Sequence, residues 1–111
     1  MDTPETTSRV RELNDELRRH SRGGQIVVTR GIAALDETLI QEVLHAVAAF
    51  DAFTEDNDPY GEHDCAILTV LGQRIMWKID YYDATLTAAS PDPSDPSVTR
   101  RVLTVMLAEE Y

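Results

Sequence analysis

The segment FTEDNDPYGEHD, residues 53–64, concentrates residue types that hold cations or move protons. It contains five carboxylates and one histidine, and it has no Lys or Arg. Clustered carboxylate oxygens are the ligands that hard divalent cations prefer. Asp56, Asp58 and Gly61 stand at positions 1, 3 and 6 of an EF-hand-like loop, but tyrosine and isoleucine occupy positions 5 and 12. A dedicated calcium loop needs oxygen ligands there, so the spacing argues against one.

A looser cation site is an alternative. If this segment folds over the ends of a later hairpin, carboxylates and one imidazole would converge and activate a water for metal-assisted hydrolysis. The ligands in this alternative are Asp56, Asp58, His63, Asp80 and Asp83. No H-x-x-x-H, C-x-x-C, phosphate-binding glycine loop or G-x-S-x-G supports an enzyme. We therefore favour a protein that is not an enzyme and has no cofactor, with a divalent cation only in the alternative.

Cys65 and two histidines have simpler roles. Cys65 opens an apolar segment, where burial makes a thiol inert, so we disfavour a nucleophilic pair with His63. His63 between two acids is typical of a hydrogen-bonded loop anchor, and His45 falls on the solvated face of an expected helix. A single cysteine excludes a disulfide framework, and no signal peptide or membrane-spanning apolar run is seen. We expect a cytoplasmic protein.

The charge is strongly negative and uneven. The 111 residues carry 20 acids against 10 bases, a net charge of -10. Residues 51–99 hold ten of the acids and only two bases, Arg74 and Lys78. Such a surface repels nucleic acid and anionic membranes and attracts basic surfaces. We expect no direct binding to nucleic acid or membrane.

The charge leads to a hypothesis for function. A rigid domain with a string of carboxylates can imitate phosphates and occupy the basic groove of a nucleic-acid-binding protein or complex. We expect a non-enzymatic acidic protein-binding domain, of the kind that mobile elements use as anti-CRISPR or anti-restriction inhibitors. The candidate surface comprises Asp51, Glu55, Asp56, Asp58, Glu62, Asp64, Asp80, Asp83, Asp92 and Asp95. A further alternative is a docking module that uses Arg18, Arg19 and Arg22.

The first half of the chain predicts two helices and a strand. Thr3-Pro4-Glu5 is typical of a helix start, and the pattern predicts a helix over Pro4–His20 with an apolar stripe of Val10, Leu13 and Leu17. Gly23-Gly24 ends it. QIVVTR, residues 25–30, predicts a strand, and residues 36–50 predict an amphipathic helix.

The second half predicts a hairpin, a short strand and a helix. CAILTVL, residues 65–71, is apolar on both faces and predicts a central strand covered on both sides. Gly72-Gln73 predicts a type II′ turn, and residues 74–82 alternate as a half-buried strand with Ile75, Trp77, Ile79 and Tyr81 on one face. Residues 85–89 predict a third strand of this half, and residues 96–109 predict a helix with Val98, Val102, Val105 and Met106 inward.

The fold class that follows is α+β. We expect a single domain, residues 1–111, with a small antiparallel or mixed sheet of about four strands and three packed helices, in the order α-β-α-β-β-β-α.

Four segments carry a family resemblance: FTEDNDPYGEHD, WKIDYYD, SPDPSDPSVTRRVLTVMLAEEY and the opening RVRELNDELRR. From Arg9 to Tyr111, the chain resembles a family of small bacterial proteins, the domain of unknown function 3768. Where we expect an aromatic residue after GEHD, this chain has Cys65 and Ala66. The resemblance implies a compact domain and supplies no catalytic residues.

Overall fold

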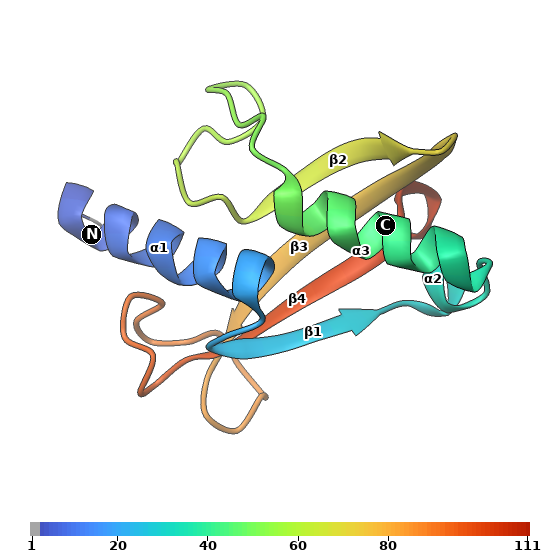
Figure 1. The fold of residues 1–111 in the computed structure, drawn as a ribbon. Coiled ribbons are helices and arrows are strands. Elements are labelled where there is room, and N and C mark those ends of the chain that lie inside the picture. Colours follow the sequence, from blue (N-terminus) through green and yellow to red (C-terminus); the bar gives the residue numbers. More distant parts are fainter. Residues whose placement is uncertain (1–2) are drawn as a thin grey trace.

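A four-stranded mixed sheet with helices on one face forms the protein (Figure 1). The computed structural model describes residues 3–111. Its elements are α1 (Pro4–His20), β1 (Gly24–Val28), α2 (Arg30–Ala33), α3 (Glu37–Ala49), β2 (Cys65–Val70), β3 (Gln73–Tyr82), β4 (Arg100–Leu107) and a 3₁₀ turn, η1 (Ala108–Glu110). The strand order is β1-β4-β3-β2, with β1 parallel to β4 and the other neighbours antiparallel. The α+β class with a small mixed sheet is confirmed.

α1 has the predicted bounds and begins at the predicted cap, Thr3, but Ser21 and not Gly23-Gly24 terminates it. The side chain of Thr3 accepts a hydrogen bond from the backbone N–H of Thr6 at 3.0 Å, and Ser21 adopts a left-handed conformation after the last turn. The buried face differs from the predicted stripe, because Asn14 and Arg18 are buried beside Val10 and Leu17. α1 therefore brings polar groups into the interior.

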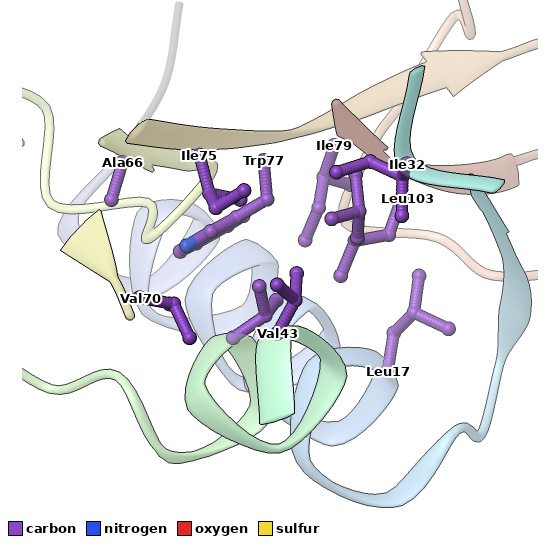
Figure 2. Packing of buried hydrophobic residues seen from close by; sticks show 11 residues of the cluster. Leu17, Ile32, Val43, Ala66, Val70, Ile75, Trp77, Ile79 and Leu103 are labelled. Carbon is purple, nitrogen blue, oxygen red and sulfur yellow. The ribbon is translucent and has the colours of Figure 1, made fainter. Parts of the chain in front are cut away.

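The core lies between α1, α3 and one face of the sheet. Figure 2 shows Ile75, Trp77 and Ile79 pointing from β3 toward the helices, where Val43 and Leu17 meet them. The inward face predicted for this strand is therefore confirmed. Ile75, Trp77 and Val43 are fully buried, and burying such a side chain contributes about 1.5–3 kcal/mol.

The predicted C-terminal helix over residues 96–109 is wrong. Arg100–Leu107 forms β4, which lies between β1 and β3. Alternate residues Arg101, Leu103 and Val105 are buried against the helices, and the β-branched content of this segment suits a central strand. The Asp95-Pro96 pair, expected to start a helix, forms a turn in which the carboxylate of Asp95 accepts from the backbone N–H of Ser97 at 2.9 Å.

Three smaller predictions on strands also fail. β2 is an edge strand and not a central one. The hairpin between β2 and β3 turns at Leu71 and Gly72, whose φ angles of 48° and 85° fit a type I′ turn and not II′. Residues 85–89 make only an isolated bridge between Tyr82 and Ala89. The short helix α2 was not predicted.

Within residues 3–111 no helix is both long enough and apolar enough to cross a bilayer.

Candidate functional site

The two acidic segments lie at the same end of the sheet. Residues 51–64 lead into the start of β2, and residues 83–99 connect the end of β3 to the start of β4. Because these strands are antiparallel neighbours, the start of β2, the end of β3 and the start of β4 lie at the same end of the sheet. In Figure 1 the two loops lie on either side of α1. We call these two loops the acidic end.

A buried polar network holds both loops of the acidic end. The side chain of Asn14, fully buried in α1, donates to the backbone O of Glu62 at 3.0 Å and to the hydroxyl of Tyr81 at 2.8 Å. That hydroxyl donates to the carboxylate of Glu62 at 2.8 Å. Arg101, also buried, donates from Nε to Asn14 Oδ1 at 2.7 Å and from its guanidinium to the backbone O of Pro93. Asn14 and Arg101 therefore connect residue 62 of one loop to residue 93 of the other.

His63 anchors the first loop to α1. Its Nδ1 lies 2.9 Å from Asp15 Oδ1, and its Nε2 lies 3.6 Å from Asp58 Oδ2. The carboxylate of Asp58 also accepts the backbone N–H of His63 at 3.2 Å. The ring stacks on Phe53, with centroids 3.8 Å apart and planes at 5°. His63 has φ 54°, a left-handed conformation that is uncommon outside glycine, so these contacts hold a strained residue.

Arg18 is a structural residue, and its assignment to a docking surface is wrong. It is 2% exposed, and its Nη1 donates to the backbone O atoms of Val47, Ala48 and Phe50 at 3.0, 3.0 and 2.7 Å. These carbonyls end α3, where the last C=O groups lack the usual helical N–H donors, although Val47 O also accepts the backbone N–H of Phe50 at 3.4 Å. Burial lowers the pKa of Arg18, and the carboxylate of Asp15 at 3.1 Å opposes that shift. Arg18 therefore caps α3 and joins it to α1.

Apart from Asp64, the carboxylates of the candidate surface fall into two groups. Some accept hydrogen bonds within the protein. Asp58 accepts from His63, Glu62 from Tyr81 and Asp80 from Lys78, and Asp83, Asp92 and Asp95 accept from residues two to four positions later in the chain. The exposed carboxylates of Asp51, Glu55 and Asp56 make no ion pair within 4.0 Å among residues 3–111. The first group shapes the loops and the second faces solvent.

Hydrogen bonds keep the shaping carboxylates of the second loop ionised. Bonds from the hydroxyl of Thr85 and the backbone N–H of Thr87 lower the pKa of Asp83. Bonds from the hydroxyl and backbone N–H of Ser97 lower the pKa of Asp95 in the same way. Hydrogen bonds to the charged form favour it. The acidic end therefore carries fixed and oriented negative charge.

Burial acts in the opposite direction at the start of β2. It raises the pKa of Asp64, and the carboxylates of Asp58 and Asp80 add to that effect. Burial also raises the pKa of the Cys65 thiol. A thiol held in its neutral form is a poor nucleophile. Burial therefore disfavours the charged form of Asp64, and Cys65 is not activated.

The five ligands of the hydrolase alternative are not brought together. Asp58 and His63 are in contact, but Asp80 bonds Lys78 at 2.6 Å and Asp83 belongs to its own turn. Asp56 is exposed. In the part of the chain that the structure describes, residues 3–111, no three His, Cys, Asp or Glu side chains are grouped to hold a metal ion.

The residues that position the acidic end were missed in the sequence. Asn14, Asp15 and Arg101 carry the network, yet each lies far along the chain from its partners, up to 87 positions for Asn14 and Arg101. One signal was available. Asn14 and Arg18 fall on the same helical stripe as Val10 and Leu17, and polar residues on a buried stripe need partners.

Comparison with known proteins identifies the family. The family described as "Protein of unknown function (DUF3768)" matches residues 28–110, so the chain belongs to it. The matched segment contains both loops and Arg101, whereas α1 with Asn14 and Asp15 precedes it. No curated protein and no solved structure matches the chain.

Proposed function

We propose that this member of the DUF3768 family is a non-enzymatic binding domain that presents its acidic end to a basic surface of another protein. The observation that carries the proposal is the joining of two acidic loops by the Asn14–Arg101 network. Forming a polar surface on a fixed scaffold lowers the entropy cost of association. Preorganised negative charge also increases the rate at which a basic partner is encountered.

The partner of this proposal is a nucleic-acid-binding protein or complex. Residues 51–99 carry ten acids against two bases, and one of these bases, Lys78, pairs with Asp80. A groove lined by Lys and Arg accepts such a surface in place of phosphates, with release of bound ions. A mobile-element inhibitor of a restriction or CRISPR system would use this chemistry. The partner, in this account, loses its nucleic acid when the acidic end binds.

The test uses charge reversal at the solvent-facing carboxylates alone. In one variant Asp51, Glu55 and Asp56 become lysine, which leaves the bonds of Asp58 and Glu62 in place. In the matched control Glu37, Glu42 and Glu109 become lysine; these are exposed residues of α3 and η1 with the same total charge change. The immobilised full chain captures its partner from a bacterial lysate, and the purified partner is then titrated with duplex DNA in competition.

We expect DNA to displace the partner from the wild-type chain and from the control. The reversal variant should lose capture, because repulsion replaces attraction at the contact. If the control lost capture to the same extent, the loss would reflect the change in net charge and not the acidic end. Capture that survives reversal, or a partner that DNA does not displace, would reject the acidic end as the binding surface.

A further inference from the structure

β1 leaves one full edge of the sheet unpaired. It is five residues long and has the sequence GQIVV, with neither charge nor proline, and among residues 3–111 it pairs only with β4. Proteins normally protect such edges with charges, prolines or bulges because an open edge recruits another strand. Ile26, Val27 and Val28 are 37%, 39% and 39% exposed. This edge is therefore both open and apolar.

The backbone groups that face outward can be assigned from the pairing. Thr29 donates its backbone N–H to Val105 O at 3.0 Å, so its backbone points toward β4. Along a strand this direction alternates with a period of two. Gly24, Ile26 and Val28 therefore direct their N–H and C=O groups away from the sheet, where an added strand would bond them.

A groove lies beside this edge on the helix-covered face. Its volume is about 260 Å³, and its lining includes Arg19, Ile26, Leu44, Val47 and Leu103. Ile26 is in register with Leu103, so its side chain lies on the same, helix-covered face of the sheet as that of Leu103. Small-molecule pockets usually measure about 300–1,000 Å³, so this groove suits one or two side chains of a peptide.

Charge and size together argue against a second copy of the chain as the occupant. Antiparallel pairing of two β1 strands about Ile26 would set Arg22 opposite Arg30 of the other copy, with like charges at both ends. A five-residue edge is about 17 Å long, and pairing along it alone falls short of the roughly 1,200 Å² that stable interfaces bury. A single peptide bound as an added strand does not need an interface of that size.

The groove also has a basic end. Arg19 is exposed and makes no ion pair within 4.0 Å among residues 3–111, while Arg22 nearby in sequence pairs with Glu16 at 2.8 Å. Arg19 lies in the last turn of α1, and Arg22 lies between α1 and the start of β1. At the other end of β1, the carboxylate of Glu110 accepts hydrogen bonds from the hydroxyl of Thr29 and the backbone N–H of Gly31. An antiparallel segment would place its C-terminal end near Arg19.

We propose that the free edge of β1 and this groove bind an extended apolar segment of another protein as an added antiparallel strand. Acidic residues at the C-terminal end of that segment lie against Arg19. Backbone bonds to Gly24, Ile26 and Val28 supply the affinity, and alternate side chains enter the groove between β1 and α3. This surface is separate from the acidic end and does not depend on it.

The experiment titrates the full ¹⁵N-labelled chain with a synthetic peptide of alternating valine and threonine residues that ends in two aspartates. We expect saturable shifts and exchange protection at the backbone amides of Gly24, Ile26 and Val28. Arg19→Glu should weaken binding about fivefold, which corresponds to about 1 kcal/mol. Arg9→Glu, an exposed arginine earlier in α1, is the matched control and should bind as the wild type does.

Two further probes keep the result independent of protein variants. A peptide methylated on alternate backbone nitrogens should not bind, because it cannot form the strand bonds. A peptide that ends in two lysines should bind more weakly than the aspartate peptide. The proposal is overturned by absence of binding, by shifts confined to residues 51–64, or by equal affinity of the lysine peptide. Shifts at β1 that grow with protein concentration alone would overturn it in favour of a second copy.

Discussion

Replacing Asn14 by alanine should strongly destabilise the protein, although the side chain is polar and small. Three hydrogen bonds are lost, at 2.7, 2.8 and 3.0 Å. The bond to Arg101 involves a charged donor, which contributes about 1.5–3 kcal/mol, and the two neutral bonds contribute about 0.5–1.5 kcal/mol each. The partners of Asn14 stay largely buried and cannot turn to water.

The expected cost is therefore about 2.5–6 kcal/mol, against a total stability of about 5–15 kcal/mol for a domain of this kind. Equilibrium urea unfolding followed by circular dichroism measures it. The first acidic loop, residues 51–64, should also become more sensitive to proteases, since its attachment to α1 through Glu62 is lost.

Asn57→Ala is the matched control. Asn57 also makes hydrogen bonds through its side chain, to the backbone of Thr54 and Ala52, but it is exposed. Water replaces those bonds, so we expect a loss below about 1 kcal/mol. A cost for Asn14→Ala no greater than that for Asn57→Ala would refute the claim that a buried network supports the acidic end.

Four other changes follow from the same geometry. Asp64→Asn should raise the melting temperature at pH 7, because the raised folded-state pKa makes ionisation costly as pH rises above the unfolded value; the gain should vanish at pH 3. Asp83→Asn should lower the melting temperature at pH 7, since the folded-state pKa of Asp83 is lowered. Thermal melts of both variants at pH 7 and pH 3 test the two predictions. Gly24→Ala should cost about 1–3 kcal/mol in urea unfolding, because the new Cβ would lie 2.5 Å from the backbone O of Arg101. Arg18→Met should cost about 3–5 kcal/mol in the same assay, since the carbonyl oxygens of Ala48 and Phe50 lose their donor.

Local signals were sufficient for α1, α3 and the inward face of β3. Thr3 and Asp36 are capping residues whose side chains accept backbone N–H bonds, so the helix starts could be read directly. The alternation of Ile75, Trp77 and Ile79 has the period of a strand and no other element. In these segments the local preference and the final packing agree.

β4 shows where local signals were insufficient. Val102, Val105 and Met106 fit one face of a helix, whereas Leu103, Val105 and Leu107 fit one face of a strand. The Asp95-Pro96 signal favoured the helix, but it is also typical of a turn. Whether this segment forms a helix or a strand depends on its pairing with both β1 and β3, and no local sequence pattern encodes that pairing.

The candidate site was predictable in composition and not in geometry. The acidic residues of both loops were evident, as was the role of His63 as an anchor, which its contacts with Asp15 and Asp58 confirm. Which carboxylates shape the loops depends partly on local bonds within turns and partly on hydrogen bonds between distant segments, such as that of Glu62 with Tyr81. Asn14 and Arg101, 87 positions apart, make the most consequential of these.

The most direct test of the central claim is the salt dependence of affinity for the captured partner. It is measured on the wild type, on the variant with lysine at positions 51, 55 and 56, and on the control with lysine at 37, 42 and 109. We predict a steep fall of affinity with salt for the wild type and control, and weak binding without that slope for the first variant. A shallow slope for the wild type, or equal loss in both variants, would contradict recognition through the acidic end.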